Sequence, residues 1–327
     1  AKPAAPSISA RAPATEPDAD DLVNDTCADT DRIGGQDGSS TTATAPAINA
    51  PTATNTQWVS TRVSQLVASA TGLRWNLDAS SRVALGYFPT VTIGATPVTF
   101  TLKFTTGALG ATANNLRFAL LDGSPSGFRT TDGFPAGEPT SVGDKGYGIF
   151  SVGSTVGGAS SANLAFNTYK RVNTASADVL GTAGDWGGTL VTGGTPPATT
   201  NTGPLGSSAG ASGYLEPDTA YTLQLTLSYD GATLSFATML TGGNLENMNY
   251  TVIDTDDPTL AFNEIALRFG GGSAQFSSIT FTGLTVTTPL GVAPAITTQP
   301  VSQTAAPGSD ATFSVVATGS PAYQWRR

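Results

Sequence analysis

The sequence predicts an all-β protein whose main body is a jelly-roll antiparallel β-sandwich with long loops. Short runs in which apolar and polar residues alternate recur along residues 22–288, and each run is typical of a strand with one buried face. Helical periodicity is scarce, because only residues 61–70 fit a short helix and their β-branched side chains suit a strand equally well. Two packed antiparallel sheets satisfy this pattern, and one continuous sandwich is the natural architecture.

The expected strands follow one another at short intervals. The clearest alternation lies in Val98–Phe104 and Tyr221–Tyr229. Asp230-Gly231 follows the second run and predicts a two-residue type I′ turn, which leads into a returning strand at Leu234–Leu240. Further strands are expected at Arg82–Phe88, Leu116–Leu121, Tyr147–Val152, Glu264–Phe269, Ser278–Phe281 and Leu284–Thr287.

Composition divides the chain into four parts. Residues 1–21 are rich in Ala and Pro, which predicts a flexible N-terminal segment. Residues 22–288 form the predicted sandwich, residues 289–293 a linker, and residues 294–327 the incomplete N-terminal part of a further β-sandwich module. Within the main sandwich, residues 153–213 are polar and rich in Gly, Ser and Thr, which predicts long surface loops of the kind that usually meet ligands.

The charge pattern excludes several classes of function. The chain has 15 Lys and Arg against 24 Asp and Glu, and this net charge of −9 argues against nucleic acid and anionic membrane as partners. No run of about 18 apolar residues occurs, so no membrane insertion is expected. Histidine is absent and Cys27 is the single cysteine, which argues against zinc, haem and copper sites and against a cystine framework.

Four segments of the body stand in a specific order. They are Asn24–Arg32, Thr56–Ser60, the run from Ser80 through Phe104 to Gly123, and Tyr221–Tyr229 with Tyr250–Asp254 and Phe262–Arg268. Together they resemble a bacterial secreted domain of the concanavalin-like jelly-roll class, although Cys27 stands where that family has an aromatic residue. The resemblance implies a jelly roll over most of residues 22–288 and an extracellular, glycan-rich setting, and it transfers no catalytic residues.

The C-terminal residues carry a second resemblance. Pro294–Thr304 is followed by a Pro307-Gly308 turn, by Ala311–Ala317, and by Tyr323-Gln324-Trp325. This order is similar to strands A, B and C of a bacterial immunoglobulin-like (Ig-like) module, which implies a larger modular protein that continues past Arg327. The small residues that open the chain are typical of a mature terminus after signal-peptide removal, so we expect an extracellular or cell-surface location.

An acidic segment near the N-terminus is the candidate metal site. Asp25, Asp29 and Asp31 fall within seven residues, and carboxylates this close repel unless a cation or several N–H donors relieve them. The pattern therefore predicts either a structural Ca²⁺ site or a solvated acidic loop, and it requires no other cofactor. A second cluster at residues 254–257 predicts a turn with capping carboxylates.

The pattern of carboxylates argues against catalysis. Retaining glycan hydrolases of this fold class place two carboxylates two residues apart on one strand, so that both reach the same face. No such run is present, and without histidine the commonest general base is missing. Tyr169-Lys170-Arg171 is the one group that resembles lyase chemistry, and an ordinary loop or edge strand is its simpler interpretation. The body's glutamates are isolated from one another: Glu138, Glu216, Glu246 and Glu264.

Aromatic side chains are the candidate ligand-binding residues. Trp186, next to Asp185 in a Gly-rich run, predicts a platform on which a sugar ring stacks, with a buried loop anchor as the alternative. Tyr169, Phe128 and Arg129 are further candidates for contact with a glycan.

The sequence as a whole predicts a non-catalytic glycan-binding module of a larger secreted or surface protein, with a polysaccharide or cell-surface glycan as its partner. Two alternatives stay open. One is a structural or adhesive surface protein whose copies assemble into a layer or filament, for which unpaired sandwich edges are suited. The other is a polysaccharide-active enzyme.

Overall fold

The computed structural model describes residues 21–27, 56–62, 65–77, 82–108, 115–129, 132–133, 141–152, 165–172, 174, 180, 186–187, 206–207, 211–270, 276–288, 296–306, 308–310 and 312–317. The chain forms two compact units, of which one is Asp21–Thr288 and the other comprises Ala1–Asp20 and Pro289–Arg327. No helix among the described residues has the length and apolar character that crossing a membrane requires.

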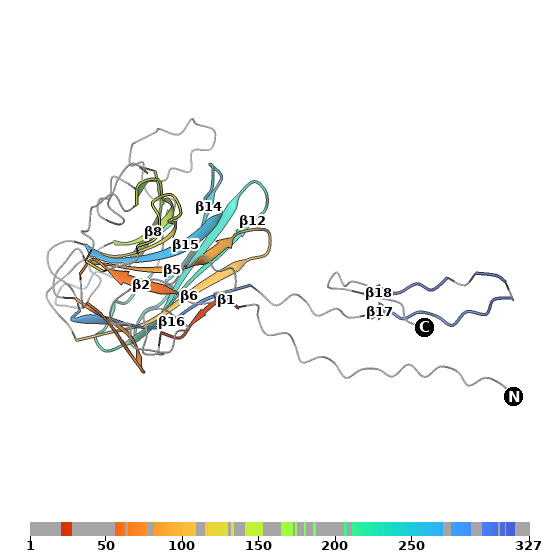
Figure 1. Ribbon diagram of the computed structural model, residues 1–327, viewed down its shortest axis with the longest axis horizontal. Coiled ribbons are helices and arrows are strands. Elements are labelled where there is room, and N and C mark those ends of the chain that lie inside the picture. The colour runs from red at the N-terminus through yellow and green to blue at the C-terminus, as the bar shows by residue number, and fades with distance from the viewer. Residues whose placement is uncertain are drawn as a thin grey trace. The chain divides into compact units, whose positions relative to one another are not determined.

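The larger unit is the predicted jelly-roll β-sandwich, built from two antiparallel sheets that we name A and B (Figure 1). In sheet A the strand order is β14–β13–β12–β6–β16–β4–β3, and β1 pairs with β16. The bounds are β1 Asp21–Asp25, β3 Leu66–Ser69, β4 Gly72–Asn76, β6 Val98–Thr106, β12 Ala220–Tyr229, β13 Leu234–Gly242, β14 Asn249–Asp254 and β16 Ser278–Thr287.

Sheet B has the order β10–β9–β8–β7–β15–β5–β2, and β11 pairs with β9. The bounds are β2 Gln57–Ser60, β5 Val83–Thr92, β7 Asn115–Asp122, β8 Lys145–Val152, β9 Ala165–Arg171, β10 Trp186–Gly187, β11 Gly206–Ser207 and β15 Ala261–Gly270. Strands that pair within either sheet are often far apart in sequence, as β6 and β12 are, so the fold depends on long-range pairing.

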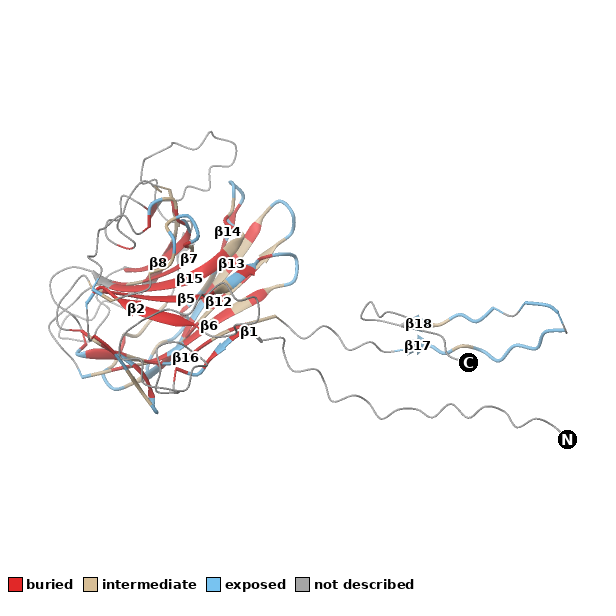
Figure 2. Ribbon diagram, viewed as in Figure 1, coloured by how far each residue is buried: buried red, intermediate tan, exposed pale blue. Residues whose placement is uncertain are grey.

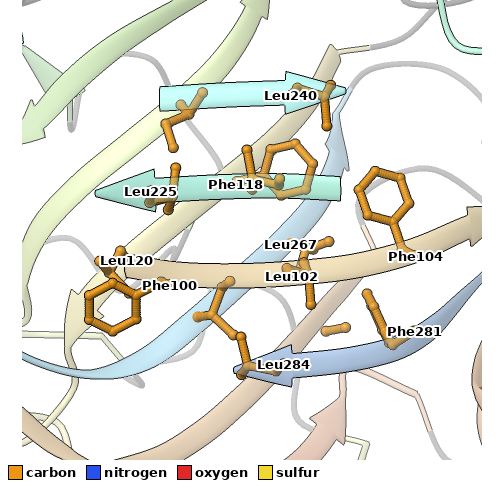
Figure 3. Packing of buried hydrophobic residues seen from close by; sticks show 14 of the residues in the cluster. Phe100, Leu102, Phe104, Phe118, Leu120, Leu225, Leu240, Leu267, Phe281 and Leu284 are labelled. Carbon is orange, nitrogen blue, oxygen red and sulfur yellow. The ribbon is translucent and has the colours of Figure 1, made fainter. Parts of the chain in front are cut away.

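The inward side chains of the two sheets form the main core, which Figure 3 shows around Phe100, Phe104 and Phe118. Alternation decides which residues enter it: the burial of β6 changes at every position along Val98–Thr106. Trp58 and Trp75 are buried as expected, and both stack on Phe281, with ring centroids 4.6 Å and 6.4 Å away. Buried residues run along the strands of both sheets (Figure 2).

Two local predictions are settled by hydrogen bonds. The ambiguous segment 61–70 contains the strand β3, not a helix. After β12 the Asp230 amide donates a hydrogen bond to the Thr233 carbonyl at 3.2 Å, so Gly231 and Ala232 lie between the paired residues, one position later than predicted. The Asp230 carboxylate accepts hydrogen bonds from the backbone of Ala232 and Thr233, at 2.9 and 2.7 Å, and these bonds close the turn and lower the pKa of Asp230.

In the smaller unit, β17 (Ile296–Thr298) pairs with β18 (Val316–Ala317). No described residue from 296 to 317 is buried, and Val301 is 71% exposed. Two paired strands without a buried face are at most marginally stable in water. The described residues of this unit therefore form a hairpin-like pair and no core.

Candidate functional site

The outer face of sheet B carries most of the residues that the sequence singles out. Across its middle, Tyr169 on β9 lies opposite Gly148 on β8, and the next strands contribute Ala119 and Ala266. This row of small residues leaves room above the sheet. A Cβ atom at Gly148 would lie 2.7 Å from the Phe150 ring and 2.9 Å from the Trp186 indole, so two aromatic rings fill that room.

Trp186 is buried, with none of its surface exposed. The short strand β10 pairs Trp186 with Arg171 at the edge of sheet B, and this pairing directs the indole onto Gly148 and the Phe150 ring, 5.4 Å away. The expectation of an exposed stacking surface at Trp186 is therefore wrong. Gly148 on β8, two strands away from β10 in sheet B, provides the space for the buried indole. Asp185, its proposed polar partner, lies outside the described residues.

Two arginines hold this aromatic cover on the sheet. The Arg117 guanidinium lies 4.9 Å above the centre of the Phe150 ring and donates a hydrogen bond to the carbonyl of Leu180. The Arg171 guanidinium lies 5.6 Å above the Trp186 ring and donates to Ser141. Cation–π contacts that are shielded from water are stronger than exposed ones. This part of the face is thus a second small core, with Leu180 and Trp186 among its buried residues.

The remaining aromatic candidates lie apart from each other. Tyr169 is half-buried on β9, with its ring 5.1 Å from Phe150, and its hydroxyl accepts a hydrogen bond from Asn167. Phe128 lies 5.1 Å from Tyr87 on β5, and Arg129 follows it. Four strand spacings separate β9 from β5, which is about 19 Å. The two rings therefore contact different strands of sheet B, although both pack against the same small core.

Glu264 is a buried carboxyl group on the same face, which the sequence pattern does not single out as functional. Its side chain is 2% exposed, and Oε1 has no hydrogen-bond partner among the described residues. A Cβ atom at residue 123 would lie 2.4 Å from Oε2, so a larger residue there would displace the Glu264 carboxyl group. Burial, and then the nearby Asp144, raise the pKa of Glu264 to about 8, while Arg171 acts in the opposite direction.

Asp144 is the second buried carboxyl group of this cluster. Burial raises its pKa to about 6, although hydrogen bonds from the Ser126 amide and hydroxyl, at 3.0 and 2.9 Å, oppose the rise. Neither Asp144 nor Glu264 reaches solvent. A sequence search for neighbouring carboxylates misses the pair because the two residues lie 120 positions apart. The available signal was the polar pair Asn263-Glu264 inside an apolar strand.

Asp25 has a structural role in the described residues. Its carboxylate accepts hydrogen bonds from the Cys27 amide at 2.7 Å, from the Trp58 indole at 3.2 Å, and from the Thr56 hydroxyl. These donors relieve the buried charge, which a cation would otherwise do. Asp29 and Asp31 lie outside the described residues, so calcium binding by Asp25, Asp29 and Asp31 stays a proposal. No group of three possible metal ligands occurs among the residues that the structure describes.

The second acidic cluster forms the predicted turn. The Asp256 amide donates to Asp254 Oδ1 at 3.0 Å, and Asp257 adopts a positive φ of 44°. Lys170 pairs with Asp254 at 2.9 Å, and the Tyr147 hydroxyl donates to the same carboxylate at 2.6 Å. Lys170 therefore serves to join β9 to this turn.

The outer face of sheet A differs from that of sheet B, because polar side chains line it and remain accessible. Along β6, β12 and β16 its positions form what we name the threonine face: Thr99, Thr101, Lys103, Thr105, Thr222, Gln224, Thr226, Thr280, Thr282, Thr285 and Thr287. The cross-strand register aligns them in rows, such as Thr285, Thr101 and Gln224. No Asp or Glu occupies a non-buried position in β4, β6, β12, β13, β14 or β16.

Comparison with known proteins gives fold-level similarities. No family model matches the chain, and no curated protein matches it. Among solved structures, the potassium-bound carbohydrate recognition domain of Emp46p is 10% identical, with 71% of this chain and 88% of that chain covered and a TM-score of 0.40. A legume lectin-like domain from Entamoeba histolytica is 13% identical, with 71% and 88% covered and a TM-score of 0.38.

A third structure, the Ca²⁺- and Man2-bound exoplasmic/lumenal domain of VIP36, is 9% identical. Its alignment covers 74% of this chain and 83% of that chain, with a TM-score of 0.39. The first two of these structures are thus a carbohydrate recognition domain and a legume lectin-like domain. At these identities and TM-scores, neither a ligand nor a binding site transfers to this chain.

Proposed function

We propose that this protein is a non-catalytic glycan-binding module. The observation that carries the proposal is the threonine face: an accessible sheet surface of hydroxyl and amide groups that lacks carboxylates, in a chain of net charge −9. Hydroxyl groups both donate and accept hydrogen bonds, which matches the hydroxyl groups of a sugar chain. Side chains on a rigid sheet also lose less conformational freedom on binding than side chains on a loop.

The dimensions of the face suit an extended polymer. Neighbouring strands lie about 4.8 Å apart, and side chains on the same face of one strand recur about every 6.8 Å. A chain that crosses β16, β6 and β12 meets a polar side chain on each strand, as in the row of Thr285, Thr101 and Gln224. Because each hydrogen bond replaces one to water, single contacts contribute little, and affinity depends on the number of rows engaged.

The half-buried residues of sheet B form a second proposed contact surface for the same function. Tyr169 and the pair Phe128–Arg129 offer ring edges and a guanidinium group at two separate places. Trp186 and Asp185 contribute to this proposed surface only if β10 moves and exposes the indole. The threonine face is the preferred surface because it needs no rearrangement.

Affinity electrophoresis through gels with a panel of neutral polysaccharides tests the proposal. We expect retardation of the wild-type chain, and its loss in the double variant Thr101→Ala/Gln224→Ala. Thr255→Ala is the matched control, because Thr255 is exposed in the turn after β14 and lies off the face. Loss of retardation in Tyr169→Ala alone would move the site to sheet B. Unretarded wild-type protein in every gel would refute glycan binding.

The setting of this module is part of the proposal. We place it outside the cell, in a larger modular protein in which an Ig-like module follows the sandwich.

Self-assembly into a layer or filament is the second candidate function, and exposed Val67 and Ile253 on the edge strands β3 and β14 favour it. Analytical ultracentrifugation of the wild type against a Val67→Lys/Ile253→Lys variant tests it. Concentration-dependent growth that the variant lacks would support assembly, and a monomer at all concentrations would refute it.

A further inference from the structure

A small polar hollow interrupts the threonine face where β1, β6 and β16 meet. Its volume is about 150 Å³, and its side chains come from Asn24, Thr26, Thr101, Lys103, Thr282 and Thr285. A β-bulge in β16 creates it: the register shifts between Phe281 and Gly283, so Thr282 has no partner opposite it and Gly283 faces Lys103. A Cβ atom at Gly283 would lie 3.4 Å from the Asp25 carbonyl oxygen, so glycine keeps side-chain atoms out of the floor beside the lysine.

Lys103 supplies an unneutralised positive charge to this hollow. It is exposed, and its ammonium group forms no ion pair or hydrogen bond with any residue that the structure describes. The hydroxyl groups of Thr101, Thr282 and Thr285 likewise have no hydrogen-bond partner in the described part of the chain. Asp25 lines the hollow too, but its carboxylate oxygens accept hydrogen bonds from three protein donors.

We propose that the Lys103 hollow binds the carboxylate-bearing residue of an acidic polysaccharide, a uronic acid unit. The carboxylate would pair with the Lys103 ammonium group, and the sugar hydroxyls would exchange hydrogen bonds with the three free threonine hydroxyls and the Asn24 amide. This inference deepens the proposed glycan binding and rests on it, since it takes the anion to be part of a sugar chain. It adds a site and a ligand class that hydroxyl complementarity alone does not specify.

Size and charge both favour this ligand. The hollow, of about 150 Å³, has room for a carboxylate group with part of its sugar ring. The rest of the polymer would continue over the adjoining rows of the threonine face. On β4, β6, β12 and β16 no non-buried position carries Asp or Glu, so these strands add no repulsion to an anionic chain on this face.

Titration calorimetry of the full chain at low salt tests the inference, with trigalacturonate, maltotriose and sodium acetate as separate probes. We expect trigalacturonate to bind, Lys103→Gln to weaken it at least tenfold, and Lys103→Arg to retain it. Arg74→Gln is the matched control, because Arg74 is an exposed cation on β4 of the same sheet and does not line the hollow. Because the contact is exposed, binding should weaken as salt rises to 0.5 M.

Three results would overturn the inference. They are equal trigalacturonate binding by Lys103→Gln, an equal loss in Arg74→Gln, or acetate binding as tightly as trigalacturonate, which would indicate a simple anion site. The test is separable from that of the proposed function. If neutral polysaccharides retard the protein but trigalacturonate does not bind, the uronate site is refuted and the proposed glycan binding stands. If trigalacturonate binds through Lys103 but no neutral polysaccharide retards the protein, binding is limited to acidic glycans.

Discussion

Single residues decide what covers the outer face of sheet B. Gly148 leaves the space that the Trp186 and Phe150 rings occupy, and the two rings in turn support Arg171 and Arg117. The tryptophan is buried because Gly148, two strands away on β8, has no side chain to occupy the space of the indole. A residue that looks like an exposed binding platform in the sequence is therefore part of the packing.

We predict that Gly148→Ala destabilises the sandwich by about 1–3 kcal/mol, because the added methyl group overlaps the Phe150 and Trp186 rings. Urea unfolding followed by tryptophan fluorescence measures the loss. Gly94→Ala is the matched control, since no atom lies within 4 Å of a Cβ at that position. An equal effect of the two substitutions would mean that the indole does not rest on Gly148.

Glu264 makes stability depend on pH. Its pKa is raised to about 8 in the folded protein, so the folded state holds a proton that the unfolded state releases above about pH 4.5. The stabilisation is fully present below pH 4.5 and is lost as pH rises through 8. Asp144, whose folded pKa is about 6, adds a loss between about pH 4 and 6.

We therefore predict that Glu264→Gln, which keeps the shape without the charge, flattens the fall in stability between pH 5 and 9. Urea midpoints at pH 5, 7 and 9 give the measurement. Glu246→Gln is the control, because Glu246 is exposed. Asp122, Asp144, Arg129 and Arg171 also act on the Glu264 carboxyl group. A wild-type protein as stable at pH 9 as at pH 5 would show that burial of Glu264 does not control its titration.

At the scale of the element, β1 is attached to the sandwich in two ways. It pairs with β16 along Asp21–Asp25, and its last residue accepts hydrogen bonds from Thr56 and Trp58, at the start of sheet B. Asp25 thus connects the two sheets at one end. Its position in an acidic segment predicts a metal ligand, whereas its buried donors give it a structural role.

We predict that Asp25→Ala costs about 3 kcal/mol, because it removes the buried carboxylate that accepts hydrogen bonds from the Trp58 indole and the Cys27 amide. Thermal unfolding with 5 mM Ca²⁺ and with EDTA separates the two roles. A loss of stability that is equal in both solutions supports the structural role. A wild-type transition that rises with Ca²⁺ and an Asp25→Ala transition that does not would show calcium binding instead.

At the scale of the whole molecule, the sandwich has its own core and the C-terminal unit has none among its described residues. We predict that a chain limited to residues 21–288 keeps the unfolding midpoint of the full chain. A peptide of residues 289–327 should show a disordered circular dichroism spectrum, because two strands without a buried face are marginal in water. A folded peptide, or a sandwich that unfolds earlier once shortened, would contradict this independence.

The sequence by itself determined the fold class, most strands and the core tryptophans Trp58 and Trp75, because period-two alternation is a local property that a sandwich must satisfy. It also indicated the turn at residues 254–257, whose hydrogen bonds are local. It placed the two-residue turn after β12 one position early, because the backbone hydrogen bond between Asp230 and Thr233 decides where the turn lies.

Only the tertiary structure decided which candidates share a surface. It buried Trp186 against Gly148, placed Tyr169 on β9 and Phe128 beside Tyr87 of β5, four strands away, and brought Glu264 close to Asp144. It also aligned threonines from three distant segments around Lys103. Each of these outcomes depends on strand order and register across long sequence separations, which alternation along one strand cannot encode.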